Sequence, residues 1–188
     1  KRVTAVIPYF SYARSDKKDG PRISIAARLI ADVLATAGVS HVITMTLHSP
    51  QVHGFFSVPV DHLADRYVFV RYLYESDLSH SVIVAPDMGH AKQASKLARL
   101  LDLPIAAVSK QRIDDTTVEA ESMIGQVRGL DAIIYDDEVA TAGTVVETVR
   151  LLEERGARSI RLVCAHGLFT GPAIERLQAL SSLSEIIT

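Results

Sequence analysis

Short apolar runs alternate with segments of helical periodicity along the whole chain, and this alternation limits the folds that the sequence can adopt. Strands are expected at 3–9, 41–47, 81–85, 104–108, 118–124, 131–137, 159–165 and 184–188. Helices are expected between Ser24, a candidate N-cap, and Gly38, and at 63–74, 91–101, 145–156 and 173–180. This order predicts an α/β protein with parallel, doubly wound sheets.

The segment 133–144 ends an apolar run in two adjacent carboxylates, Asp136 and Asp137, and continues through a loop of small and hydroxyl residues into a helix. The first turn of a helix has unpaired N–H groups and a partial positive charge, so it can hold a phosphate. Gly143 would let the backbone approach the anion, and Thr141 and Thr144 would add hydroxyl donors. The carboxylates could accept from sugar hydroxyls or reach Mg²⁺ through water.

A plainer interpretation of the same segment is also open. Two aspartates at a strand end are typical of a solvated turn, and Thr-Ala-Gly-Thr is typical of a helix cap. The residues by themselves leave both interpretations standing.

Composition excludes several classes of protein. The 188 residues are 48% hydrophobic and 22% charged, which suits one or two compact units with a buried core. With a net charge of −2, the chain lacks the excess of positive charge that is typical of proteins that bind nucleic acid or an anionic membrane. The one cysteine, Cys164, lies in an apolar run, so it is expected to be a buried thiol in a reducing compartment. We therefore expect a soluble cytoplasmic protein.

Other expected strands also end in polar groups, namely His48, Asp87 and Lys110. The carboxyl ends of parallel strands lie on one side of a sheet, so these groups could converge on one crevice with Asp136 and Asp137. His48 and Asp87 together could bind Mg²⁺, although each alone is typical of a structural histidine or a helix-cap acid.

Basic residues form two candidate phosphate clamps. Lys110 and Arg112 share one side of an extended segment and could neutralise charge on a transferred phosphoryl group, or form a solvated basic turn. Arg14, Lys17 and Lys18 could hold a polyphosphate, or be surface charges balanced by neighbouring acids. The apolar loop at 49–61 is expected to pack against a partner surface or a domain seam.

Six blocks, in the same order, resemble the ribose-phosphate pyrophosphokinase family. They are Tyr9-Phe10-Ser11-Tyr12-Ala13-Arg14-Ser15-Asp16-Lys17-Lys18, the run 47–56, Val58-Pro59-Val60-Asp61, Pro86-Asp87-Met88-Gly89, the Asp136-Asp137 loop, and His166-Gly167-Leu168-Phe169-Thr170-Gly171-Pro172-Ala173. The resemblance implies transfer of the β,γ-diphosphoryl group of ATP to the 1-hydroxyl of ribose 5-phosphate, giving phosphoribosyl pyrophosphate and AMP.

The resemblance also implies roles for individual residues. Arg14, Ser15, Asp16, Lys17 and Lys18 match the ATP-binding loop, and His48 and Asp87 match positions associated with the Mg²⁺ cofactor. Lys110 and Arg112 match the catalytic segment. The ribose 5-phosphate loop is matched by Asp136, Asp137, Thr141, Ala142, Gly143 and Thr144.

The implied organisation is two phosphoribosyltransferase-like units in tandem, at 1–65, where the unit is incomplete, and at 66–188. Members of the family form homo-oligomers with shared active sites, and no nucleic acid or membrane partner is implied. The sequence departs from the family pattern at five positions: Ser15, Thr46, Ser57, His90 and Ala140. Loss of acids at Thr46, Ser57 and Ala140 keeps open a non-catalytic regulatory homologue. An ordinary phosphoribosyltransferase would need a nucleobase-binding hood, which we do not find.

Overall fold

The computed structural model describes residues 1–111 and 120–188 and contains two compact units, Lys1–Asp65 and Arg66–Thr188. Both are built from parallel strands and covering helices, which confirms the predicted fold class. Within the described ranges, no helix has the length and apolar composition needed to cross a membrane.

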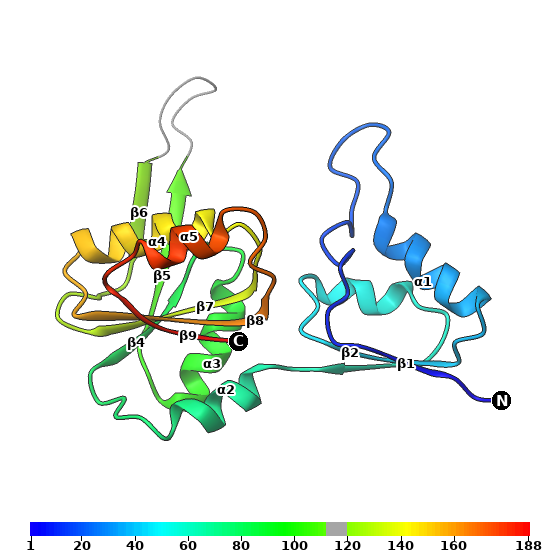
Figure 1. The fold of residues 1–188 in the computed structure, drawn as a ribbon, viewed down its shortest axis with the longest axis horizontal. Helices are drawn as coiled ribbons and strands as arrows, with labels where there is room; N and C mark the ends of the chain where they lie inside the picture. Colours follow the sequence, from blue (N-terminus) through cyan, green and yellow to red (C-terminus); the bar gives the residue numbers. More distant parts are fainter. Residues whose placement is uncertain (112–119) are drawn as a thin grey trace. The chain divides into compact units, whose positions relative to one another are not determined.

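The first unit is a three-stranded parallel sheet in the order β1-β2-β3. Its elements are β1 (Thr4–Ile7), α1 (Ala26–Thr36), β2 (His41–Met45), the 3₁₀ helix η1 (Pro50–Phe55) and β3 (Val60–Leu63). Figure 1 shows α1 and the cyan η1 on the same face of this sheet. Between them lies a small core made of Phe10, Ala13, Ala27, Leu47 and Val52.

The predicted N-cap of α1 is wrong. Its N-cap residue is Ile25, and the hydroxyl of Ser15, not that of Ser24, accepts from the amide of Ala26 at 3.0 Å. The helix buries Ala27 and Ala31, and Ile30 and Leu34 pack against the core of this unit, whereas Leu29 and Val33 are exposed.

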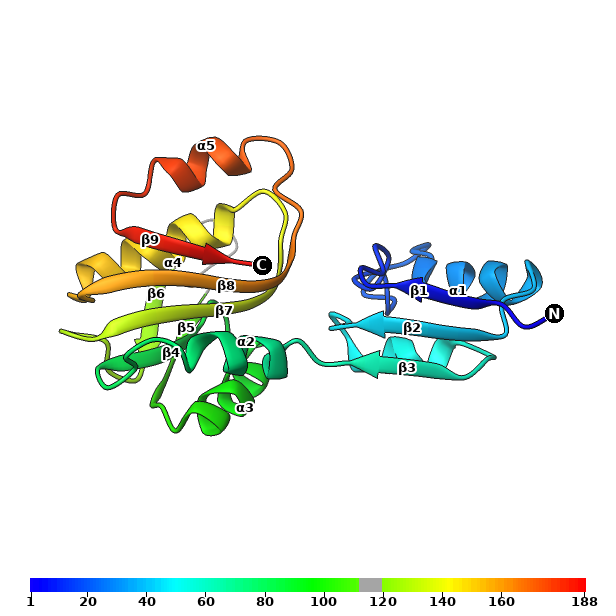
Figure 2. The same cartoon turned by 60° about the horizontal axis from the view of Figure 1, so that its bottom comes forward.

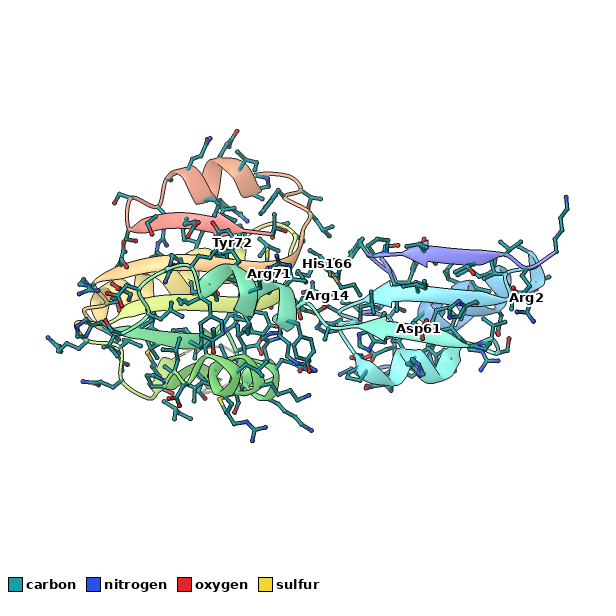
Figure 3. The ribbon with its side chains drawn as sticks, turned by 90° about the horizontal axis from the view of Figure 1, so that it is seen from below. Arg2, Arg14, Asp61, Arg71, Tyr72 and His166 are labelled. Carbon is teal, nitrogen blue, oxygen red and sulfur yellow. The ribbon has the colours of Figure 1, made fainter. Side chains whose placement is uncertain are left out.

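The apolar loop at 49–61 was expected to pack against a partner surface or a domain seam, and part of it packs on its own unit. Val52 in η1 is fully buried, and Phe55 and Phe56 pack against the core of the first unit. Phe56 also contacts the ring of Phe10, with centroids 5.5 Å apart. The segment ends in β3, a strand that the sequence pattern did not indicate, where Asp61 pairs with His41 of β2 (Figure 3).

The second unit is a six-stranded sheet in the order β6-β5-β4-β7-β8-β9. Its strands are β4 (Ser81–Ala85), β5 (Ile105–Gln111), β6 (Ala120–Ile124), β7 (Asp131–Val139), β8 (Ser159–Gly167) and β9 (Leu183–Ile187). Its helices are α2 (Arg66–Leu73), α3 (Ala91–Leu101), α4 (Gly143–Glu154) and α5 (Ala173–Gln178). In Figure 2, α4 and α5 cover one face of the sheet, and α2 and α3 cover the other.

Alternate side chains of the central strands pack against the helices on the two faces of the sheet. Val82 and Val84 of β4 pack with α4 and α5, whereas Ile83 and Ala85 pack with α2 and α3. Successive side chains of a strand point to opposite faces, so a continuous apolar run is the expected sequence of a strand covered on both sides. Cys164 of β8 is fully buried, as predicted. The helix layer is also held at its rim, where Tyr72 of α2 donates to Glu185 of β9 at 2.6 Å (Figure 3).

The edge strand β6 departs from the predicted parallel sheet, because it pairs antiparallel with β5. The segment 112–119 that joins the two strands is shorter than the dozen or so residues that a parallel crossover needs. After β6 the chain turns at Gly125, whose φ is +96°. A Cβ there would lie 2.7 Å from the carbonyl oxygen of Ile105, so this close return depends on glycine.

Candidate functional site

The loop between β7 and α4 presents a helix N-terminus. The N-cap residue is Ala142, whose φ of 60° is left-handed, and its methyl side chain has no oxygen to cap the helix. This geometry weighs against the interpretation of the loop as a simple helix cap. Gly143, which was expected to let the backbone approach an anion, begins α4, and a Cβ there would meet only ordinary contacts within the chain. The left-handed backbone conformation lies one residue earlier, at Ala142.

The loop is held by the segment that follows β8. The carbonyl of Val139 accepts from the amides of Leu168 and Phe169 at 3.0 and 3.1 Å, and that of Ala140 accepts from Thr170 at 2.8 Å. These bonds link two of the sequence blocks, the Asp136-Asp137 loop and the run His166 to Ala173. Figure 3 shows His166 at the carboxyl end of β8, where this segment begins.

Arg176 of α5 makes a further contact with the loop. Its Nη1 donates to the carbonyl oxygen of Thr141 at 2.9 Å, and a Cβ on Gly143 would lie 3.9 Å from the same nitrogen. A cation is thus fixed beside the first turn of α4. The sequence analysis did not identify this residue, because nothing in its local pattern shows which loop it reaches.

The two acids Asp136 and Asp137 lie inside β7 and are largely enclosed. The amide of Asp137 donates to Oδ1 of Asp136 at 2.9 Å. Burial, followed by the neighbouring Asp137 carboxylate, raises the pKa of Asp136 to about 8, and the charge of Asp87 acts in the same direction. Ionisation of Asp136 is therefore disfavoured unless a cation or a hydrogen-bond donor lies beside it.

Asp87 and His90 reach the same region from the segment between β4 and α3. Oδ1 of the exposed Asp87 accepts from the amide of His90 at 2.8 Å. The imidazole of His90 packs edge-on against Tyr135, and its Nδ1 lies 4.0 Å from Oδ1 of Asp136. The structure thus brings Asp87, Asp136 and Asp137 together as expected. It adds His90, which stands three residues after Asp87, a spacing that could have signalled it.

The remaining candidate residues of the second unit lie on β5 and beyond. Lys110 belongs to β5, where its backbone is in register with Glu121 of β6. Arg112 lies outside the described residues.

The candidate metal ligand of the first unit, His48, is exposed and follows β2. The chain reaches it through Thr46, whose φ of 42° is left-handed. The amide of Thr46 donates to Leu63 at 3.0 Å, and its hydroxyl accepts from the amide of Asp65 at 3.1 Å. Thr46 therefore has a structural use in setting the direction of the chain before His48.

The candidate ATP loop follows β1 in the first unit. Arg14, Lys17 and Lys18 are exposed, and Arg14 can be followed in Figure 3. Lys17 pairs with Asp19 at 3.6 Å, and Asp16 accepts from Gln51 at 3.0 Å. Ser15 is occupied as the cap of α1, since its hydroxyl also donates to the carbonyl of Ser24 at 3.2 Å.

Comparison with known proteins gives two family matches. Residues 59–176 match the phosphoribosyl transferase domain, and residues 1–38 match the N-terminal domain of ribose phosphate pyrophosphokinase. The ribose-phosphate pyrophosphokinase of Deinococcus radiodurans is 54% identical over 181 residues, which are 95% of this chain and 57% of that protein. The chain belongs to the ribose-phosphate pyrophosphokinase family.

Other members of the family agree over nearly the whole chain. A putative ribose-phosphate pyrophosphokinase of Streptomyces coelicolor is 52% identical over 99% of this chain and 59% of its own length. The crystal structure of the phosphoribosylpyrophosphate synthetase from Mycobacterium smegmatis superposes with a TM-score of 0.91 at 37% identity, covering 99% of this chain and 60% of that one. The chain thus spans a little under three fifths of the curated relatives it matches.

A more distant likeness shows the fold alone. The adenine phosphoribosyl transferase of Trypanosoma brucei superposes with a TM-score of 0.50 at 16% identity, covering 65% of this chain and 61% of that one.

Proposed function

We propose that this protein transfers the β,γ-diphosphoryl group of ATP to the 1-hydroxyl of ribose 5-phosphate, giving phosphoribosyl pyrophosphate and AMP. The observation that carries the proposal is the loop after β7, where the N-terminus of α4 opens beside two enclosed carboxylates. A ligand that suits both ends has a phosphate for the helix and hydroxyl donors for the acids. Sugar phosphates have this combination.

In this proposal, Thr141, Ala142, Gly143 and Thr144 bind the 5-phosphate. The side chains of Thr141 and Thr144 are exposed and can donate their hydroxyls to it. Asp136 and Asp137 accept from ribose hydroxyls and orient the sugar. Arg176 holds the carbonyl of Thr141, which keeps the loop in position when the anion binds.

The triphosphate of ATP is assigned to the loop of the first unit. Arg14, Lys17 and Lys18 supply exposed cationic groups for it, and Asp16 positions the loop through Gln51. Ser15 holds the same loop to the start of α1. Ser15 therefore fixes the ATP-binding loop of which it is part.

The reaction is a displacement at phosphorus. The 1-hydroxyl oxygen of ribose 5-phosphate attacks the β-phosphorus of ATP and releases its proton to solvent. The bond from that phosphorus to the α,β-bridging oxygen breaks, and AMP leaves with the electron pair. Lys110 and Arg112 stabilise the charge on the transferred group. Asp87 is exposed, and the amide of His90 donates to only one of its carboxylate oxygens, Oδ1. Carboxylate oxygens suit Mg²⁺, so we assign Asp87 and His48 as the residues that would hold this ion. Mg²⁺, when bound, neutralises phosphate charge.

We also propose that the protein works in the cytoplasm as a homo-oligomer. The first unit leaves several large apolar side chains exposed, namely Val6, Leu29, Val33 and Leu63. Large apolar side chains left exposed in this way are available to a surface that another polypeptide covers. Size-exclusion chromatography with light scattering would measure the assembly.

The decisive experiment follows the phosphorus NMR spectrum of the protein with ATP, ribose 5-phosphate and Mg²⁺. AMP appearing together with phosphoribosyl pyrophosphate supports diphosphoryl transfer, whereas ADP indicates a different kinase. An unchanged spectrum with ribose 5-phosphate still bound favours the regulatory homologue that Thr46, Ser57 and Ala140 left open. Consumption of phosphoribosyl pyrophosphate in the presence of bases would identify an ordinary phosphoribosyltransferase.

Lys110→Ala tests the catalytic segment in the same assay. Its turnover should fall by orders of magnitude while the protein stays folded. Lys96→Ala, on α3, is the matched control and should keep the parent rate. Parental turnover in Lys110→Ala would remove Lys110 from the mechanism.

A further inference from the structure

Three metal-ligating side chains from two separate elements meet at the carboxyl end of β7. His90 comes from the segment before α3, and Asp136 and Asp137 come from β7. One ligand atom from each lies within 4.8 Å of the other two. The side chains of His90 and Asp136 are 11% and 13% exposed, so the cluster is enclosed yet keeps an opening to solvent.

The spacing of the cluster suits an ion better than a direct hydrogen bond. Nδ1 of His90 and Oδ1 of Asp136 are 4.0 Å apart, which exceeds hydrogen-bonding distance. Bonds from a divalent transition metal to nitrogen or oxygen are about 2.0–2.2 Å long, so two ligands of one ion lie at most about 4 Å apart, and closer in a tetrahedral site. Small side-chain rotations would therefore be needed to bring all three ligand atoms onto one ion.

Charge also favours a cation in this position. Two adjacent carboxylates in an enclosed site repel one another, and Asp87 adds a third negative charge nearby. An ion between Asp136, Asp137 and His90 would offset this repulsion. The imidazole of His90 suits Zn²⁺, and the two carboxylates also suit Mn²⁺.

We propose that His90, Asp136 and Asp137 form a transition-metal site that binds Mn²⁺ or Zn²⁺ directly to the second unit, without nucleotide or sugar phosphate. The site is distinct from the Mg²⁺ position assigned to His48 and Asp87, because its nitrogen ligand is His90. Three protein ligands leave further coordination positions for water. The site does not depend on the proposed diphosphoryl transfer, since metal binding is measured in the absence of substrates.

Electron paramagnetic resonance of Mn²⁺ tests this site in the full chain, because the signal of free Mn²⁺ decreases as the ion binds. His90→Gln should weaken Mn²⁺ binding by at least about 10-fold, as expected when one of three ligands is lost. His80→Gln, which changes an exposed histidine of the same unit, is the matched control and should bind as the parent does. Added Zn²⁺ should displace the bound Mn²⁺ from the parent protein.

A second readout separates ligation from a structural effect. Pulsed measurements are made in a His48→Gln background, which removes the imidazole of the position assigned to Mg²⁺. Bound Mn²⁺ should then show coupling to the imidazole ¹⁴N with His90 or with His80→Gln, and none with His90→Gln. Circular dichroism melting in EDTA checks that the variants fold. Asp136→Asn is a second variant that removes a proposed ligand, and it should also bind Mn²⁺ more weakly. Parental affinity in His90→Gln, or ¹⁴N coupling that survives that substitution, would overturn the proposal.

Discussion

The guanidinium of Arg176 donates a hydrogen bond to the carbonyl oxygen of Thr141 at 2.9 Å, which fastens α5 to the loop before α4. The bond fixes the first residue of the proposed phosphate cradle. It also places a permanent positive charge beside the N-terminus of α4, where an anion is already favoured. Arg176 is therefore expected to act on sugar-phosphate binding as well as on loop geometry.

Arg176→Ala should raise the dissociation constant for ribose 5-phosphate by about 10-fold, equivalent to about 1.4 kcal/mol. Isothermal titration calorimetry without ATP would measure the affinity. Arg176→Lys keeps the charge but loses the fixed fork geometry, so its affinity should lie between those of the parent and the alanine variant. Arg150→Ala, on the exposed surface of α4, is the control. Equal affinities in all four proteins would show that Arg176 has no part in binding.

The sequence predicted the elements of the second unit well because their apolar patterns are unambiguous. β4 and α3 occupy the predicted ranges, Ser81–Ala85 and Ala91–Leu101. The first unit was harder, since β3 has only a short pattern that is exposed on one side. The cap of α1 could not be found locally, because Ser15 reaches Ala26 from eleven residues away. Caps supplied by tertiary contacts leave no signal beside the helix.

Separate alanine substitutions of Ser15 and Ser24 test this cap. Ser15→Ala should destabilise the start of α1 by about 1 kcal/mol, because the amide of Ala26 loses its acceptor. Ser24→Ala should have little effect, since only its backbone carbonyl takes part. Hydrogen exchange at the amide of Ala26 measures the difference locally. Faster exchange in Ser24→Ala than in Ser15→Ala would restore Ser24 as the cap.

The site was also only partly accessible from the sequence. The positions of Asp87, Asp136 and Asp137 at the ends of predicted strands indicated that they lie close together, because parallel strands bring their carboxyl ends to one side of the sheet. The sequence could not identify Arg176, whose importance depends on which loop it reaches, and it showed His90 only as a departure from the family pattern. Nor could it indicate the left-handed conformation of Ala142, because that conformation is more usual for glycine.

Substitution of Ala142 tests the strained loop. Ala142→Val should lower the free energy of unfolding by about 2 kcal/mol or more, because a β-branched side chain combines a left-handed backbone with a buried position. Ala142→Gly relieves the backbone but removes a buried methyl group, so its stability should stay within about 1 kcal/mol of the parent. Urea unfolding measures both. A valine variant as stable as the parent would show that the loop relaxes freely.

The pair Asp131 and Arg158 gives the fold a dependence on pH. Nε of Arg158 donates to Oδ1 of Asp131 at 2.7 Å, and the hydroxyl of Ser159 donates to the same oxygen at 2.8 Å. The hydrogen bond from Arg158 is the main reason that the pKa of Asp131 is lowered. A carboxyl whose pKa is lower in the folded state stabilises the fold above its unfolded pKa, near 4, and this contribution is lost as the pH falls through the folded pKa.

Asp131→Asn should therefore lower the melting temperature at pH 7 by about 2–4 °C, the shift expected for a modest loss in a chain of this size. The deficit should shrink as the pH falls below about 4, because the parent carboxyl then takes up a proton and loses the same interaction. Differential scanning calorimetry from pH 2.5 to pH 7 measures the difference. Glu153→Gln, on the exposed side of α4, should show no such dependence. A deficit of constant size at every pH would mean that the amide is tolerated poorly for steric reasons, and that the charge of Asp131 does not stabilise the fold.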